Sequence, residues 1–356
     1  MALFKFLKKK EGKIPRGFYE ISIKEVRRLT NLSVQIVLDI PAELKDEFRF
    51  SPGQYINFII ATEGEDHRRS YSICSGSNED LSIAVKEMQF GKVSQWFNRI
   101  AKAGTKILCS QPEGQFLLKD DQKNVVAFSG GSGITPILSI AKKIQETGRN
   151  MELFYGNYDL SAMIFRDEID ALSNVKPHYV FSDESTGDYK KGLMDQEMVS
   201  SLLKENIDLL NADAFFLCGP LGMIEAAEAQ LLLFGVQKSK IKKELFSSPA
   251  VKDEVLASVD SKEVSSEVKV FLEGEEIHIK YKIKGKGIID TLNNEGYDPP
   301  YSCRGGVCST CKCKVIEGTA TMKINYSLTD EDIEQGYILA CQAVPTSEKL
   351  TISFDE

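Results

Sequence analysis

The sequence predicts a multidomain protein with three folded units: an antiparallel β-barrel, an α/β domain with a doubly wound parallel sheet, and a small α+β domain. Three observations support this. Short strands separated by turns fill the chain to about residue 117, strands alternate with helices after Lys119, and a glycine-rich loop at 301–313 carries four cysteines. A chain of 356 residues is long enough for two or three domains.

The expected boundaries follow changes in composition. We expect an N-terminal tail at 1–17, the barrel at 18–119, the α/β domain at 120–248, a linker at 249–266 and the last domain at 267–356. The linker is assigned because 249–266 is polar and charged and contains no aromatic residue.

The barrel is predicted from runs of alternating residues at 18–26, 32–40, 54–60, 81–88 and 105–112, with turn residues at 51–54 and 75–80. In the α/β domain, strands are expected at 124–130, 151–157, 177–183 and 214–218, and helices at 137–148, 162–173, 194–206 and 221–235. The last domain is expected to contain a hairpin from Val268, a short acidic helix near Thr329 and two closing strands.

Composition excludes some functions. The net charge of −8 and a sequence pI near 5.3 argue against a nucleic-acid-binding surface. No stretch approaches the roughly 18–20 apolar residues of a membrane span. The basic run near the N-terminus follows a few apolar residues, the reverse of the order in a secretory signal, so we expect a cytoplasmic protein.

Cysteine spacing gives the clearest chemical signal. The loop has the pattern C-x4-C-x2-C, and a fourth cysteine follows after 29 intervening residues. This is the plant-type [2Fe–2S] spacing, and a structural zinc site is the main alternative. Cys313 falls outside the pattern and is expected not to be a ligand. The predicted ligands are Cys303, Cys308, Cys311 and Cys341.

Two segments of the barrel have the chemistry of a flavin site. In Arg69-Ser70-Tyr71-Ser72, the arginine can pair with a phosphate, the ring can stack on a flavin, and the last hydroxyl can hydrogen-bond flavin N5. The segment from Gly91 to Ser94 opens a helix whose N–H groups suit a pyrophosphate. This second segment comprises Gly91, Lys92, Val93 and Ser94. Taken alone, the first segment is compatible with an ordinary barrel strand, and the second with an ordinary helix start.

Two segments of the α/β domain suit a nucleotide. GGSGITP at 130–136 follows a strand and opens a helix, as a phosphate-binding loop requires, although it is not a G-x-G-x-x-G string. The strand at 214–218 ends on Cys218, at the sheet edge where doubly wound folds bind ligands. A buried structural cysteine is the alternative for Cys218.

Together these motifs, in this order, resemble the ferredoxin–NADP reductase superfamily with a C-terminal plant-type ferredoxin domain of β-grasp-like fold. The chain is similar to the reductase subunits of phenylacetyl-CoA epoxidases and related oxygenases. The resemblance implies that Arg69, Ser70, Tyr71, Ser72 and Gly91, Lys92, Val93, Ser94 bind FAD. It implies further that the residues that bind the nicotinamide nucleotide are Gly131, Gly133, Ile134, Thr135, Cys218 and Gly219.

The resemblance also implies catalytic roles for Tyr71, Ser72, Cys218 and Glu244, with Phe246 covering the flavin. A nicotinamide nucleotide gives up a hydride, whereas a [2Fe–2S] cluster takes one electron, so FAD is expected between them. Asp159 and Asp183 stand where users of NADPH in the family often carry arginine, which favours NADH slightly. Arg166, Lys190 and Lys191 could compensate.

The expected acceptor is a multicomponent oxygenase such as phenylacetyl-CoA epoxidase. A general reductase of ferredoxin, flavodoxin or a diffusible acceptor is the first alternative, and a redox sensor is the second. The acidic segment at 329–332 could guide a basic partner, but a helix cap explains the same residues.

Overall fold

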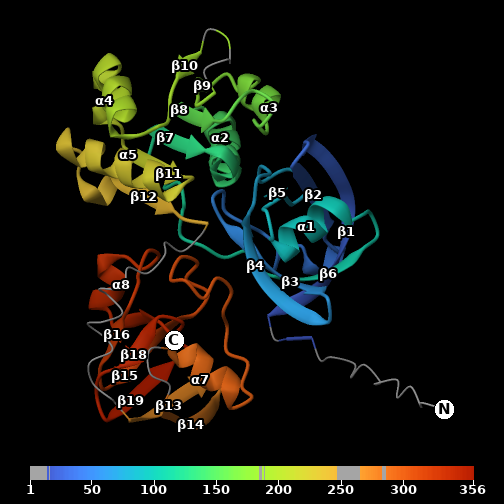
Figure 1. The fold of residues 1–356 in the computed structure, drawn as a ribbon, viewed down its shortest axis with the longest axis vertical. Coiled ribbons are helices and arrows are strands. Elements are labelled where there is room, and N and C mark those ends of the chain that lie inside the picture. Colours follow the sequence, from blue (N-terminus) through green and yellow to red (C-terminus); the bar gives the residue numbers. More distant parts are fainter. Residues whose placement is uncertain (1–13, 16, 184–186, 188, 247–264, 283–285) are drawn as a thin grey trace.

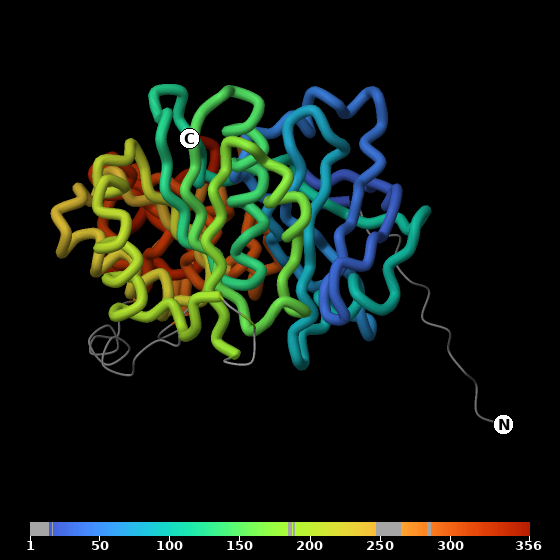
Figure 2. Tube along the Cα trace, turned by 90° about the horizontal axis from the view of Figure 1, so that it is seen from above, coloured from blue at the N-terminus to red at the C-terminus, as the bar shows by residue number. Residues whose placement is uncertain are grey.

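The computed structural model describes residues 14–15, 17–183, 187, 189–246, 265–282 and 286–356. These residues form three units, each built on its own main sheet (Figure 1). Seen from above, the first and second units stand side by side, with the third below the second (Figure 2). This confirms the predicted fold class. Most of the expected tail and linker lies outside the described residues, and the last sheet begins at Ser266.

The first unit is a strongly curved antiparallel sheet in the order β4-β3-β6-β1-β2-β5. A bridge between Ile73 and Ile83 links the two edge strands, so the sheet curls toward a barrel. Alternating residues such as Ile21, Ile36 and Phe58 are fully buried inside it. The elements are β1 (Phe18–Thr30), β2 (Ser33–Asp39), β3 (Tyr55–Thr62), β4 (Glu65–Ser72), β5 (Ser82–Lys86), α1 (Lys92–Arg99) and β6 (Lys106–Ser110).

The second unit is a parallel sheet in the order β10-β9-β8-β7-β11-β12. One face packs against α2 and α3, and the other against α4 and α5, because the central strands are apolar on both sides. The strands are β7 (Asn124–Gly130), β8 (Asn150–Asn157), β9 (Val175–Phe181), β10 (Lys190–Lys191), β11 (Ala214–Cys218) and β12 (Ile241–Glu244). The helices are α2 (Ile134–Thr147), α3 (Arg166–Asp170), α4 (Gln196–Glu205) and α5 (Leu221–Leu233).

One helix of this unit is shorter than predicted. The sequence favours a helix over 162–173, but α3 spans only Arg166–Asp170. The preceding residues form a turn in which the Asp159 carboxylate accepts from the Ser161 hydroxyl at 2.7 Å and from the Ala162 N–H at 2.8 Å. These bonds satisfy the local backbone outside a helix.

The third unit is a mixed sheet in the order β14-β13-β19-β15-β17, with a small second sheet of β16 and β18. The expected hairpin is present, but three strands rather than two close the domain, and the helix α7 was not predicted. The elements are β13 (Ser266–Leu272), β14 (Glu275–Tyr281), α7 (Ile288–Asn294), β15 (Lys312–Glu317), β16 (Ala320–Met322), α8 (Asp330–Glu334), β17 (Tyr337–Leu339), β18 (Ala343–Pro345) and β19 (Lys349–Ser353).

Specific contacts join the three units. Phe116 and Phe216 meet edge to face at 5.1 Å between the first and second units. Arg68 forms a bidentate pair with Asp298 of the third unit at 2.7 and 2.8 Å, with its side chain only 11% exposed. Within the described part of the chain, none of the helices has the length and apolar character needed to cross a membrane.

Candidate active site

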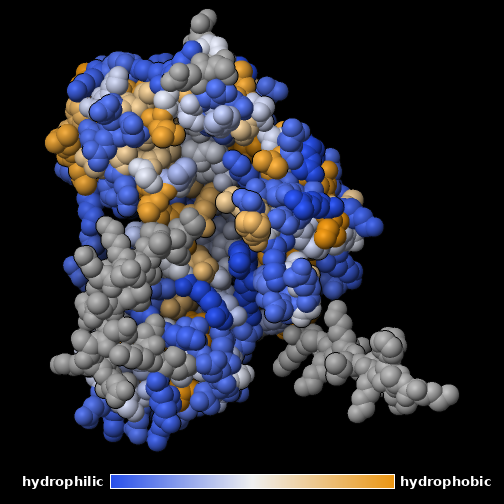
Figure 3. Space-filling view, viewed as in Figure 1, coloured by the Kyte–Doolittle hydropathy of each residue, from blue (hydrophilic) through white to orange (hydrophobic). Residues whose placement is uncertain are grey.

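A cavity of about 280 Å³ lies where the three units meet. In Figure 3, apolar surface lies beside the hollow between the units. We call this space the junction cavity. It is lined by Tyr55, Arg69, Ser70, Ser72, Glu244, Leu245, Phe246, Cys303, Val307 and Cys308.

Ser72, Cys218 and Glu244 are brought together by strand pairing. β12 lies parallel to β11 with Glu244 directly beside Cys218, and the Ser72 hydroxyl donates to the Glu244 carboxylate at 2.8 Å. Burial raises the pKa of Glu244 to about 7, while the hydrogen bond from Ser72 opposes the rise. Burial also holds the pKa of the Cys218 thiol well above its usual range, so this thiol is neutral. The cluster can therefore hold a proton at Glu244.

Strand alternation places Arg69 and Tyr71 on the opposite face of β4 from Ser70 and Ser72. Tyr71 packs edge to face on Phe97 of α1, with ring centroids 5.5 Å apart, and burial raises its pKa. On the same face, the Nε2 atom of His67 is buried without a hydrogen-bond partner among the described residues. Because this nitrogen lies 4.0 Å from the Glu65 carboxylate, it is the arginine and the aromatic ring that suit a bound anionic cofactor.

The predicted pyrophosphate segment opens α1, with Gly91 as its N-cap. Ser94 is already engaged, because its hydroxyl accepts from the Met88 N–H at 3.0 Å and donates to the Gly91 carbonyl at 2.9 Å. Lys92 pairs with Glu63 at 3.0 Å, and Val93 is buried. The backbone N–H groups, rather than these side chains, remain suited to a phosphate.

A second cavity, of about 500 Å³, lies at the carboxyl edge of the parallel sheet, and we call it the glycine-loop cavity. Gly131 lines it with a φ of +53°, which favours glycine. At Gly133 a Cβ atom would stand 2.1 Å from the Cys218 carbonyl oxygen, so only glycine lets the two loops pack together. Ile134 and Thr135 are buried in the first turn of α2, away from the cavity.

Lys86 is a lining residue that sequence reasoning missed. It ends β5 of the first unit but lines the glycine-loop cavity, with its Nζ 3.9 Å from where a Cβ would stand on Gly131. A lysine facing a glycine-rich helix start suits a phosphate. Its position follows from the packing of two domains, which no local sequence signal reveals.

The four predicted cluster cysteines lie in two pairs. Gly305 N–H points to the Cys303 sulfur at 3.3 Å, and Cys303 N–H points to the Cys308 sulfur at 3.5 Å. The Cys308 thiol and then nearby backbone N–H groups lower the pKa of Cys303 to about 6. Cys341 is the main neighbour of Cys311, and this contact together with burial holds the pKa of the Cys311 thiol well above its usual range. N–H groups directed at sulfur in the first pair suit iron–sulfur ligation, and the C-x4-C-x2-C spacing favours a two-iron cluster over a single zinc ion.

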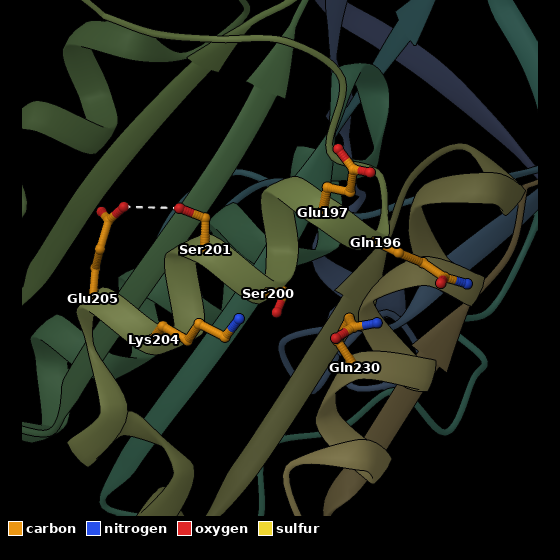
Figure 4. Close-up of a pocket in the computed structure, with 7 residues that line it drawn as sticks. All are labelled: Gln196, Glu197, Ser200, Ser201, Lys204, Glu205 and Gln230. Atoms are coloured by element: carbon orange, nitrogen blue, oxygen red, sulfur yellow. Dashed lines mark hydrogen bonds between the residues drawn. The ribbon is translucent and has the colours of Figure 1, made fainter.

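A larger cavity, of about 570 Å³, lies away from these residues, between α4 and α5 (Figure 4). It is lined by polar side chains of α4 and by Gln230 of α5. None of the predicted site residues lines it, so it does not contribute to the proposed chemistry.

Comparison with known families assigns each unit. Residues 20–117 match the oxidoreductase FAD-binding domain, 128–229 the oxidoreductase NAD-binding domain, and 270–346 the 2Fe-2S iron-sulfur cluster binding domain. The chain is 33% identical to a subunit of 1,2-phenylacetyl-CoA epoxidase from Escherichia coli (strain K12), over 95% of this chain and 98% of that protein. The chain belongs to the ferredoxin–NADP reductase-like oxidoreductases that carry a C-terminal [2Fe–2S] ferredoxin domain. We therefore call its units the FAD, NAD and ferredoxin domains.

Other known proteins align along nearly the whole of this chain. The ferredoxin reductase component of 3-ketosteroid-9-alpha-monooxygenase from Rhodococcus rhodochrous is 29% identical, over 96% of this chain and 99% of that protein. Among solved structures, phthalate dioxygenase reductase aligns with a TM-score of 0.60 and 23% identity, covering 95% of this chain and 98% of that one. An intact self-sufficient cytochrome P450 monooxygenase aligns with a TM-score of 0.73 and 19% identity, covering 94% of this chain and 41% of that one.

These findings confirm that the protein is an NAD(P)H-dependent oxidoreductase with FAD and a [2Fe–2S] cluster as cofactors. The residue assignments stay predictions. Arg69, Ser70, Ser72, Glu244, Phe246, Cys303 and Cys308 line the junction cavity, and Gly131 lines the glycine-loop cavity. The residues near the site that the sequence did not indicate include Tyr55, Lys86, Leu245 and Val307.

Proposed function

We propose that this protein is the reductase component of a multicomponent oxygenase, which takes a hydride from NADH and delivers single electrons to the oxygenase through its ferredoxin domain. The observation that carries the proposal is the junction cavity itself. Ser72 and Glu244 lie on its walls, and Cys303 and Cys308 of the ferredoxin domain complete them. The similarity to epoxidase and monooxygenase reductases supports an oxygenase as the acceptor.

FAD, when bound, supplies the conversion of an electron pair into single electrons. The chain's own residues do the rest. Arg69 offers a guanidinium to the cofactor phosphates. The Ser72 hydroxyl, which donates to Glu244 while that carboxylate is ionised, can donate to a ring nitrogen once Glu244 is protonated and donates to Ser72 instead. Glu244, whose pKa lies near neutrality, holds a proton one hydrogen bond from that hydroxyl. Phe246, at the cavity rim, is placed to shield the site from water.

The preference for NADH is argued from the ends of β8 and β9. The Asp159 carboxylate is turned back onto Ser161 and Ala162, and Asp195 lines the glycine-loop cavity with Tyr158 and Ser182. Two of the three candidate basic residues are engaged elsewhere, because Lys190 pairs with Glu205, and Arg166 pairs with Asp170 at 3.4 Å. The third, Lys191, is exposed and does not line the cavity. An additional 2′-phosphate near the ends of β8 and β9 would meet the Asp195 carboxylate, whereas Lys86 faces the Gly131 turn.

The test is a reconstitution assay. The purified holoprotein is mixed anaerobically with NADH or NADPH and then with a candidate oxygenase encoded beside it, a separate ferredoxin, a flavodoxin or a small acceptor. We expect a higher kcat/KM for NADH and the fastest electron delivery to the oxygenase. Equal delivery to the separate ferredoxin would support the general reductase instead. Slow NADH oxidation with every acceptor, including a small one, would point to a redox sensor.

A further inference from the structure

A set of buried hydrogen bonds joins the FAD domain to the loop that carries the cluster cysteines. We call it the docking seam. The Tyr55 hydroxyl bonds to the Cys308 carbonyl and lies 3.2 Å from the Thr310 hydroxyl, while the Asn57 amide donates to Thr310 at 3.3 Å. The seam comprises Tyr55, Asn57 and Ser70 of the FAD domain and Ser302, Cys308 and Thr310 of the ferredoxin domain.

The donors in this seam can be assigned by elimination. Two groups that only accept face the Tyr55 hydroxyl, the Cys308 carbonyl and, farther away at 3.4 Å, the Glu113 carboxylate. Its single proton goes to the nearer carbonyl, so Thr310 can donate to the Tyr55 oxygen. Since Asn57 donates through its nitrogen, its oxygen is free to accept from the Ser70 hydroxyl at 2.7 Å. Ser302 then donates to Ser70 at 2.9 Å. The hydrogen bonds of the seam therefore form one mutually compatible set, with Glu113 as an additional acceptor beside Tyr55.

Most of the seam is buried, although Ser70 and Thr310 are half-buried. Tyr55 is 6% exposed, Asn57 1% and Ser302 4%, so losing one bond would leave a buried polar atom without a partner. Beside the seam, Tyr301 lies between the Arg68 guanidinium at 4.5 Å and that of Arg304 at 4.2 Å. These contacts favour one position of the ferredoxin domain against the FAD domain.

We propose that Tyr55 is a positioning residue, which holds the cluster loop as one wall of the junction cavity and makes this chain's own ferredoxin domain the first acceptor of electrons from the flavin. Tyr55, Ser72, Cys303 and Cys308 all line this cavity, so a separate ferredoxin cannot reach the same edge while the seam is closed. The inference rests on the proposed function, because it concerns the step between hydride uptake and delivery.

Opening the seam has two consequences. Electrons pass more slowly from the flavin to the cluster, because the loop leaves its place at the cavity. The cavity also becomes accessible to dioxygen, which accepts two electrons from the reduced flavin together with two protons and leaves as hydrogen peroxide. Ser72 is the cross-strand neighbour of Tyr55, but Ser72, Cys218 and Glu244 make none of the seam's hydrogen bonds, so we expect hydride uptake from NADH to be unaffected.

The test compares the holoprotein with its Tyr55→Phe variant, which keeps the ring and removes the hydroxyl. Tyr19→Phe is the matched control, because the Tyr19 hydroxyl accepts from Gln111 at 3.0 Å within the FAD domain. For Tyr55→Phe we expect flavin reduction by NADH at the normal rate, cluster reduction slowed about tenfold, and more hydrogen peroxide per NADH. Hydrogen–deuterium exchange of 301–311 should also rise, a readout that does not depend on turnover.

The outcomes are separable. If NADH reduces the flavin of the unchanged protein but Tyr55→Phe and Tyr19→Phe behave alike in cluster reduction and exchange, the positioning role is wrong while the proposed function stands. If NADH fails to reduce the flavin of the unchanged protein, the proposed function itself fails. Thr310→Val should slow cluster reduction as well, and combining it with Tyr55→Phe should add less than the sum of the two effects. Full additivity would contradict a shared seam.

Discussion

Ser72 of the FAD domain donates a hydrogen bond of 2.8 Å to the carboxylate of Glu244, the last residue of β12 in the NAD domain. This bond joins the flavin-binding strand to the strand that lies beside Cys218. The pair that can hold a proton is thus divided between two domains, and the position of Ser72 and that of Glu244 depend on each other. The bond gives the first two predictions their physical basis.

Replacing Ser72 with alanine should slow flavin reduction by NADH at least about tenfold. The hydroxyl is the donor to a buried carboxylate, and hydrogen bonds to charged groups contribute roughly 1.5–3 kcal/mol. Stopped-flow absorbance under anaerobic conditions measures the rate directly. Ser77→Ala, on the exposed turn of the same domain, is the control and should leave the rate unchanged.

Glu244→Gln should change how stability depends on pH. The folded-state pKa of Glu244 is raised from 4.5 to about 7, so the wild-type stability associated with its protonated form is complete below pH 4.5 and is lost as the pH rises toward 7. The glutamine variant has no such loss, and its relative stability should therefore increase over this window, by roughly 3 kcal/mol at most. Urea unfolding at about pH 5 and about pH 8 measures the difference. A constant difference between the two pH values would argue against a perturbed Glu244.

Cys341→Ser should abolish the cluster, whereas Cys313→Ser should retain it. Cys341 pairs with Cys311, but Cys313 is fully buried in β15 and packs in the ferredoxin core. Iron content per chain and the visible absorbance of the cluster distinguish the two variants. Loss of iron in the Cys313 variant, with its fold intact by circular dichroism, would mean that the ligand set is wrong.

Lys86→Met should raise the KM for NADH about tenfold and leave kcat nearly unchanged. The lysine faces the Gly131 turn rather than the reacting edge, so it contributes binding that is the same before and during hydride transfer. Steady-state kinetics with a small acceptor separate the two constants. The exposed Lys102 provides a charge-matched control, Lys102→Met, for which neither constant should move.

The parts of the fold predicted best are those with strong periodicity. The central strands β7, β8 and β11 are short apolar runs, and the cysteine pattern fixes the ferredoxin domain by its spacing alone. The helix α7 was missed because it has only seven residues, one of them a β-branched threonine and two of them asparagines. The strand β12 was missed because two lysines conceal its pairing with β11.

The site residues could be predicted from the sequence only where they belong to a single continuous motif. Ser72 and Glu244 were each named by resemblance, but their hydrogen bond depends on how two domains pack. Tyr55 looks like an ordinary strand residue in the sequence, because its hydroxyl finds its partner 253 residues later in the chain. Lys86 escaped notice for the same reason. Contacts across domains leave no periodicity in the sequence.

The central claim is that reducing equivalents enter as a pair at the flavin and reach the cluster only from there. It is tested most directly by removing FAD from the purified protein, retaining the cluster, and adding NADH without oxygen. We predict that the cluster stays oxidised until FAD is restored, after which the chain takes up three electrons, two in the flavin and one in the cluster. Reduction of the cluster by NADH at the normal rate in the flavin-free protein would contradict this claim.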